Sequence, residues 1–157
     1  MAVQKPLVII SGQIQQIPAG DTLSAAASEV DVVSLTAGAT VVALCPVYIS
    51  AANEFNKAAA NASATAKVIG FAQDGITAAA SGLIQTDGII TGTTGEWDAI
   101  AGTTGGLTAN TVYFLSGTAG LITSTAPSTS GHRIVKVGTA ISTTDLEMSI
   151  SDSILLA

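Results

Sequence analysis

The chain of 157 residues has few charged and few aromatic residues. Charged residues make up 10% of the sequence and aromatic residues 4%, whereas about a quarter of an ordinary globular domain is charged. The five Lys and Arg residues are scattered, and the formal net charge is −6. Binding to nucleic acid or to an anionic membrane surface needs concentrated positive charge. The sequence therefore predicts neither of these partners.

Cysteine and long apolar runs are also scarce. Cys45 is the single cysteine, so no intrachain disulfide can form, and this fits a reducing cytoplasm. The longest apolar runs, such as Val41–Cys45, are far shorter than the roughly 20 residues that span a membrane. The N-terminus also lacks the apolar region of a signal peptide. We therefore expect synthesis in a cytoplasm, without export or membrane insertion.

Motifs typical of catalysis or cofactor binding are missing from the sequence. His132 is the sole histidine, so one chain cannot form a two-histidine site, although three copies could meet on the axis of a trimer. The sequence contains no G-x-S-x-G elbow, no phosphate-binding glycine motif and no calcium loop. Cys45 ends an apolar run before Pro46, which favours a buried, inert thiol over a nucleophile. We expect no catalytic residues, no cofactor and no bound metal, and isolated aspartates that shape turns.

Small and β-branched residues make up much of the chain instead. The chain has 27 Ala, 20 Thr, 16 Gly and 15 Ser residues, which together supply half of it. Ile, Val and Thr favour pleated strands because they branch at Cβ. A chain of this length can bury the core of one domain. We predict an all-β fold, a small antiparallel β-barrel or jelly-roll-like domain over residues 24–157, preceded by an N-terminal arm over residues 1–23.

Short strand patterns, separated by turn signals, run along the whole chain. The clearest alternation is near the C-terminus, where Leu146, Met148 and Ile150 share one face of a strand. Turn signals such as Asp74-Gly75 separate the patterns. The other predicted strands cover Leu7–Ser11, Gln13–Ile17, Val30–Leu35, Thr40–Leu44, Val47–Ser50, Lys67–Ala72, Gly82–Gln85, Gly88–Thr91, Thr111–Ser116, Leu121–Ser124 and Arg133–Ile141.

The sequence offers one helix candidate and one tryptophan. The Ala-rich segment Asn56–Ala66 predicts a short helix or 3₁₀ turn. Trp97 lies between two Gly-Thr-Thr-Gly segments, at residues 92–95 and 102–105, which we interpret as loops. In such a loop Trp97 is either a lid over the end of the barrel or an anchor for an interface or a stacked ligand.

Two stretches resemble segments of tailed-bacteriophage virion proteins. Lys5–Leu23, with the sequence KPLVIISGQIQQIPAGDTL, resembles a segment near the start of many such proteins, fibres included. The stretch from Gly106 to Ser142, with GLTANTVYFL and VKVGTAIS, is similar to the closing module of phage head-fibre and capsid-decoration proteins. Within it Tyr113 can fill the barrel. Asn110 stands where the family more often has glycine and tolerates a left-handed conformation. Gly138 suggests a bulge or a close backbone approach.

The resemblance implies a homotrimeric β-barrel protein on the capsid surface of a virion, with the major capsid protein and other copies of itself as partners. We therefore expect a capsid decoration (cement) protein that binds the outside of a phage head and stabilises the shell. The alternative is a head-fibre or tail-fibre protein that contacts the host surface or its glycans through Thr-rich loops and Trp97. The resemblance further implies that the arm attaches to the capsid, through Lys5, Leu7, Ile9, Gln13, Gln15, Gln16 and Asp21.

Overall fold

The N-terminal hairpin is the first part of the fold. The computed structural model of the chain describes the backbone of residues 7–10 and 13–16, and all of residues 31–157. β1 (Leu7–Ile10) and β2 (Gln13–Gln16) pair antiparallel, which confirms the two strands predicted there. The predicted boundary between the arm and the barrel, after residue 23, lies outside the described residues.

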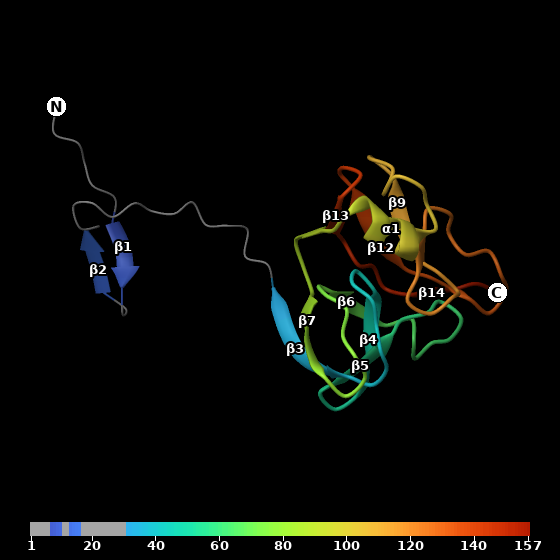
Figure 1. Cartoon of the computed structure of the whole chain (residues 1–157), viewed down its shortest axis with the longest axis horizontal. Coiled ribbons are helices and arrows are strands. Elements are labelled where there is room, and N and C mark those ends of the chain that lie inside the picture. Colours follow the sequence, from blue (N-terminus) through green and yellow to red (C-terminus); the bar gives the residue numbers. More distant parts are fainter. Residues whose placement is uncertain (1–6, 11–12, 17–30) are drawn as a thin grey trace.

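A closed barrel of five short strands follows, with the strand order β3-β5-β4-β6-β7 (Figure 1). All neighbours in it are antiparallel except β3 and β5, which pair parallel at Thr36 and Ala37. The all-β prediction is therefore confirmed, and the barrel is antiparallel except at this one pair. Its strands are β3 (Val32–Ala37), β4 (Pro46–Ala51), β5 (Glu54–Lys57), β6 (Val68–Ala72) and β7 (Ser81–Gln85).

The barrel ends at Gln85, and the rest of the predicted barrel domain folds as a second region. An antiparallel sheet there has the order β10-β9-β12-β13-β8, and in Figure 1 it forms the yellow-to-red half beside the barrel. A two-stranded ribbon of β11 and β14 completes it. The strands are β8 (Ile89–Thr91), β9 (Val112–Leu115), β10 (Ile122–Thr123), β11 (Arg133–Ile134), β12 (Lys136–Ala140), β13 (Asp145–Met148) and β14 (Ile154–Leu155).

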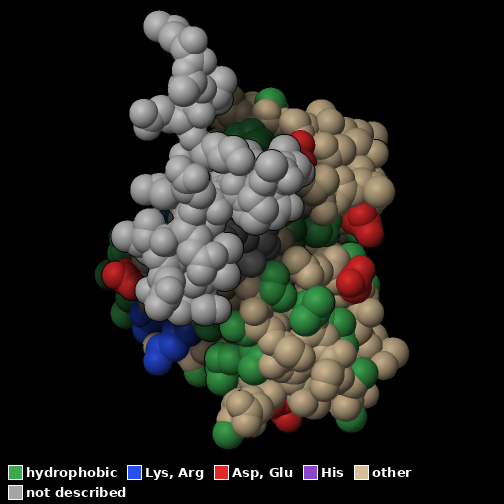
Figure 2. Space-filling view, turned by 90° about the vertical axis from the view of Figure 1, so that its left-hand side faces the viewer, with side chains coloured by type: hydrophobic (Ala, Val, Ile, Leu, Met, Phe, Trp, Pro, Cys, Tyr) green, Lys and Arg blue, Asp and Glu red, His purple; other side chains and the backbone are tan. Residues whose placement is uncertain are grey.

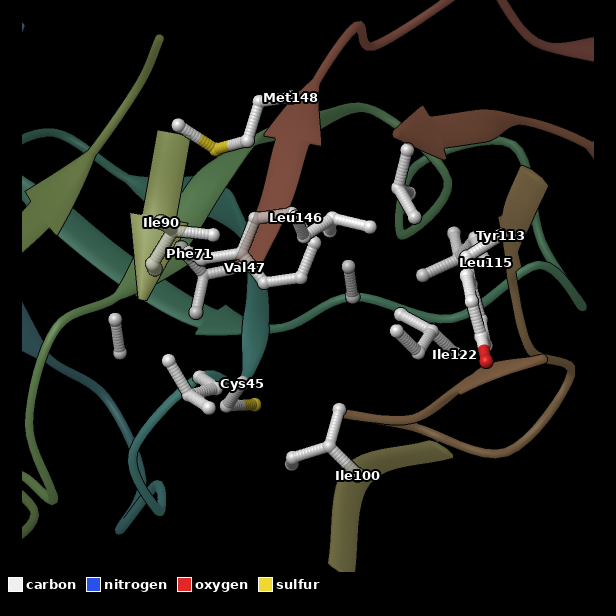
Figure 3. Packing of buried hydrophobic residues seen from close by; sticks show 14 of the residues in the cluster. Cys45, Val47, Phe71, Ile90, Ile100, Tyr113, Leu115, Ile122, Leu146 and Met148 are labelled. Atoms are coloured by element: carbon white, nitrogen blue, oxygen red, sulfur yellow. The ribbon is translucent and has the colours of Figure 1, made fainter. Parts of the chain in front are cut away.

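One hydrophobic core is shared by the barrel and the second region. Figure 3 shows side chains of both regions in this cluster, among them Phe71 of β6 and Ile90 of β8. Leu146 and Met148 are buried and Glu147 between them is exposed, which confirms the predicted alternation as far as Met148, where the strand ends, so Ile150 lies outside it. Continuous burial of aliphatic side chains therefore holds the two regions together.

The only helix among the described residues is α1 (Thr94–Ala101), where the sequence analysis placed a loop. Thr93 caps it. The Thr93 Oγ1 accepts a hydrogen bond from the Glu96 N–H (3.2 Å), and the Glu96 carboxylate accepts one from the Thr93 N–H (2.8 Å). This reciprocal capping box satisfies backbone groups that the helix start leaves unpaired. Gly102, with φ of 65°, ends the helix, so the two Gly-Thr-Thr-Gly segments bracket a helix.

The helix predicted over Asn56–Ala66 is wrong. The segment begins within β5 and continues as loop and turns. The N–H groups of Ala58 and Ala60 donate to the carbonyl oxygens of Pro46 (2.9 Å) and Ser116 (2.8 Å), not to a helical turn. Both alanine side chains are fully buried. The alanines are used for their small size, because they let the loop pass close against the core.

The strand predicted over Thr40–Leu44 is also wrong. In the described part of the chain this segment forms only an isolated bridge, between Val41 and Ile76. Leu44 adopts a left-handed backbone conformation with φ of 61°. Non-glycine residues rarely adopt that conformation, and it cannot continue a strand. The turn it makes instead directs the chain into β4.

The local features predicted within Gly106–Ser142 are confirmed. Asn110 has a φ of 59°. Lys136 pairs with Phe114 and Gly138 pairs with Tyr113, so one extra residue forms a bulge between them. Tyr113 is fully buried, and its hydroxyl oxygen accepts a hydrogen bond from the Thr108 N–H (3.0 Å).

Candidate interaction surfaces

The predicted attachment residues that the structure describes lie on the N-terminal hairpin. Leu7 and Ile9 belong to β1, and the register places Leu7 opposite Gln16 and Ile9 opposite Ile14. β2 contains the three predicted glutamines, Gln13, Gln15 and Gln16. The antiparallel pairing of β1 and β2 therefore places these attachment residues in one two-stranded ribbon. Two predicted residues fall outside the described part of the chain, namely Lys5 and Asp21.

Trp97 is buried, which contradicts its interpretation as an anchor for an interface or a stacked ligand. Its side chain is 0% exposed, and its indole Nε1–H donates a hydrogen bond to the Thr144 carbonyl oxygen (2.8 Å). Its ring meets Phe71 of the barrel edge to face, with 6.4 Å between the ring centroids. The interpretation of Trp97 as a lid is the one that this contact supports, although a helix carries it.

Cys45 and His132 are the single cysteine and the single histidine of the chain. Cys45 is buried, and burial raises the pKa of its thiol to about 12, against a smaller lowering by the charge of Lys57. The prediction of a buried, unreactive thiol is confirmed. His132 is partly buried and precedes β11. Among the described residues, no group of three or more His, Cys, Asp and Glu side chains could hold a metal ion.

Two aspartates organise loops of the second region. The Asp98 carboxylate accepts hydrogen bonds from the backbone N–H groups of Gly106 (2.8 Å) and Gly105 (3.0 Å) and from the Thr103 hydroxyl (2.9 Å). These bonds, the Gly106 N–H first, lower the pKa of Asp98. Hydrogen bonds from hydroxyl groups, that of Ser142 first, lower the pKa of Asp145. The prediction that isolated aspartates shape turns holds for both.

The surface formed by residues 31–157 includes two shallow hollows that we considered as sites. The larger, of about 580 Å³, is formed where the start of β6 meets the segment before β14, and it is lined by Ala66, Lys67, Val68, Ile150, Ser151, Asp152 and Ser153. The smaller, of about 320 Å³, lies between the loop after β6 and the start of β7. The larger hollow has one charge of each sign and no group of side chains directed at a particular ligand.

Apolar side chains are exposed around the start of β3. Val32 is 40% exposed and Val33 is 39% exposed, and Leu83 on the neighbouring strand β7 is 48% exposed. Figure 2 views the molecule from the side where β3 lies in Figure 1 and shows hydrophobic side chains gathered over this part of the barrel. Exposed apolar residues that are grouped, rather than scattered, indicate a contact surface. Leu83 is opposite Ser34 and so shares the face of Val32, whereas Val33 points to the other face. We call Val32 and Leu83 the β3 patch.

Further large apolar side chains are exposed on the second region. Ile89 and Val112 lie on the outer face of its sheet, in one row of paired residues with Thr139 and Glu147. Ile154 and Leu155, on the ribbon, are also exposed. None of these residues can be identified as a contact from the sequence, because an aliphatic residue in a strand pattern is predicted to be buried until the strand pairing is known.

Comparison with known proteins adds no family to this description. No protein-family model matched the chain, and no curated protein gave a match. Within residues 31–157, no helix has the length and apolar character needed to cross a membrane.

Proposed function

We propose that the protein is a capsid decoration (cement) protein, made in the cytoplasm of a bacterial host and located on the outside of a phage head. Its partners in this role are the major capsid protein and other copies of itself, arranged as a homotrimer. By binding the assembled shell and not its separate subunits, such a protein shifts the equilibrium towards the intact shell.

The observation that carries the proposal is that one chain has both a hairpin arm and a barrel with exposed apolar side chains. The arm contains the predicted attachment residues on β1 and β2, and the apolar side chains of the β3 patch are 40% and 48% exposed. A surface of small and apolar residues can meet another protein at little desolvation cost. Both features are suited to a protein that functions by binding to other protein surfaces.

Self-association is supported by the number of large apolar side chains that one copy leaves exposed. They occur on the barrel, on the outer face of the second sheet and on the β11–β14 ribbon. Association buries such side chains, and a closed ring buries the same patch on each copy. A trimer satisfies this with the three-fold symmetry available on a capsid lattice.

A fibre protein that touches the host surface is the weaker alternative. Trp97 was its aromatic contact, and the side chain is fully buried and hydrogen-bonded to Thr144. Stacking on a glycan needs an exposed ring face. The fibre hypothesis is left with threonine-rich loops alone.

The test is binding to phage heads that lack the protein. We expect the full chain to sediment with such heads, to appear as regularly spaced copies in a reconstruction of the particle, and to raise the temperature at which the heads open. Density confined to the tail, or no binding to heads, would contradict the proposal.

A deletion series tests the role of the arm. We expect the variant lacking residues 1–23 to lose head binding while its barrel and second region stay folded. The control is Ser128→Ala in an exposed loop, which should bind heads as the wild type does. Head binding by the deletion variant at wild-type affinity would show that the attachment surface lies elsewhere.

A further inference from the structure

The first half of β3 has one unpaired edge. β3 pairs with β7 from Val32 to Thr36, but with β5 only at Thr36 and Ala37. The N–H groups of Thr36 and Gly38 point to the β5 side, where they donate to the carbonyl oxygens of Asn53 and Phe55, each at 2.9 Å. Peptide groups alternate in direction along an antiparallel strand. Those of Val32 and Ser34 therefore point to the same side, where no strand of the described chain pairs with them.

The side chains on both faces of β3 next to this edge are exposed as well. Val32 and Val33 point to opposite faces because consecutive strand residues do, yet both are about two fifths exposed. Proteins normally protect an exposed edge with lysine, proline or a bulge. The segment Val32–Leu35 has the sequence VVSL and none of these devices. An unprotected edge of this kind is suited to receive another strand.

The N-terminal hairpin is a strand pair in need of a partner. Among the described strands, β1 and β2 pair only with each other. A two-stranded ribbon on its own is at best marginally stable in water. β1 has the sequence LVII, and a strand that is apolar at every position is typical of burial on both faces. The hairpin thus needs a further strand to pair with, and the β3 edge has unpaired backbone groups that such a strand could use.

We propose that β1 of one copy adds to the β3 edge of a second copy, so that the hairpins are exchanged around the oligomer. Apolar β1 then lies beside Val32–Leu35, in which three of the four residues are aliphatic, and cross-strand aliphatic pairs stabilise a sheet. β2, with the sequence QIQQ, keeps its polar outer edge free to face the shell. The proposal rests on the self-association in the proposed function and names the surfaces that make it.

A second copy accounts for the pattern of β1 better than the chain's own barrel does. One barrel can cover only one face of an added ribbon, whereas two copies that meet at the exchange site can cover both. The 15 residues between Gln16 and Val32 span up to about 50 Å when extended. That length is enough for the hairpin to reach a neighbouring barrel.

The first experiment removes the hydrogen-bond donor at the open edge. Ser34→Pro deletes an N–H that points away from β7, so it leaves the barrel's own hydrogen bonds in place, and its ring blocks strand addition. The matched control is Ser128→Pro, in an exposed loop. By light scattering we expect wild type and control at the mass of an oligomer, and Ser34→Pro at the 15.5 kDa of a single chain. A monomeric wild type, or an assembled Ser34→Pro, would overturn the proposal.

The second experiment distinguishes exchange from folding back within one chain, and it does not depend on how well Ser34→Pro folds. Ile9→Cys and Ser34→Cys are placed in separate chains, mixed, and treated with a short bismaleimide. The buried native thiol of Cys45 should not react. We expect covalent dimers from the mixture and linked oligomers from chains that carry both substitutions. Linkage only within single chains, or no linkage, would overturn the exchange.

Head binding by the same variants separates this inference from the proposed function. If Ser34→Pro stays assembled and binds heads, the hairpin exchange fails and the coat function stands. If neither wild type nor Ser128→Pro binds heads, the proposed function fails whatever their mass.

Discussion

The barrel and the second region are stabilised in different ways, although each is built from one uninterrupted stretch of chain. The barrel, from Val32 to Gln85, closes on itself, so its strands have partners on both sides except at the start of β3. The sheet between Ile89 and Met148 is open, with one face in the core and the other exposed. Closure removes unpaired edges, whereas an open sheet depends on the loops that join its strands.

Those loops are fixed by side-chain hydrogen bonds. Asp98, Asp145 and Tyr113 each accept hydrogen bonds from neighbouring turns. Besides the shared core, the regions are connected by the edge-to-face pair of Phe71 and Trp97 and by the bonds that Gln85 makes across the chain between β7 and β8. Backbone hydrogen bonds such as that from the Ala60 N–H to the Ser116 carbonyl oxygen (2.8 Å) connect them as well. The barrel is thus stabilised by the closed pairing of its strands, and the sheet by its polar turns and by the barrel against which it packs.

Removing the indole between the two regions should have the largest effect. Trp97→Ala deletes a fully buried side chain, its hydrogen bond to Thr144 and its contact with Phe71. We expect a loss of about 3–5 kcal/mol in the free energy of unfolding, measured by denaturant titration. Trp97→Phe is the control, because it keeps an aromatic edge and should lose less. Equal losses would show that the aromatic contact does not join the regions.

Adding a methyl group to a tightly packed glycine compares the two regions position by position. A Cβ on Gly70 in the barrel would collide with the backbone oxygen of Gln85, and one on Gly138 in the sheet with that of Glu147. We expect each alanine variant to lose up to about 3 kcal/mol, with the larger loss in the closed barrel, whose backbone has less room to shift. Chemical denaturation measures both.

Gly95→Ala is the control for the glycine pair. The residue is in α1, and nothing lies within 4 Å of its added Cβ. Alanine in a helix is more stable than glycine by up to about 1 kcal/mol. A destabilising Gly95→Ala would mean that the losses at Gly70 and Gly138 cannot be assigned to their close contacts.

Breaking the polar link between the regions should have a smaller effect. The Gln85 side chain is buried, and its Nε2 donates to the carbonyl oxygens of Asp87 (3.0 Å) and Ile89 (2.9 Å). Gln85→Leu keeps the volume but leaves both oxygens without this donor, and we expect a loss of about 2 kcal/mol. Hydrogen exchange should rise first at the N–H groups of β8. Unchanged exchange there would place the connection elsewhere.

Acid should weaken the second region through Asp98, with the smallest effect in this series. The pKa of Asp98 is lowered in the folded protein, so its contribution is fully present above its ordinary value of about 4 and is lost as the pH falls through the lowered value. Asp98→Asn should reduce the melting temperature at pH 7, and the difference from wild type should shrink below about pH 4. A difference that stays constant with pH would contradict a role for the charge.

Most strands of the fold could be predicted from the sequence, because β-branched residues and turn signals alternate along it. β5 could not, since Glu54-Phe55-Asn56-Lys57 has one apolar residue, and only its place in the closed barrel makes it a strand. The capping pattern Thr93-x-x-Glu96 indicates a helix start, but the Gly-Thr-Thr-Gly segments on either side of Trp97 favour loops. The Ala-rich segment Asn56–Ala66 predicts a helix because alanine favours helices, whereas in the structure its alanines allow close packing of a loop against the core.

The contact surfaces were harder to predict than the fold. The sequence indicates the arm, but for Trp97 it leaves a lid over the barrel and an interface anchor both open, because nothing local distinguishes a buried tryptophan from an interfacial one. It gave no sign of the β3 edge, since Val32–Leu35 reads as an ordinary core strand. The edge exists because β5 pairs with β3 only at its end, and such partial pairing is a property of the whole barrel.

Because Trp97 is the single tryptophan of the chain, the protein carries its own fluorescent reporter at the junction of its two regions. The indole lies in a dry site with its N–H on a carbonyl oxygen. Any process that parts the sheet from the barrel brings this one ring into water. The resulting red shift of its emission would follow that separation in real time, in the purified protein, without a label.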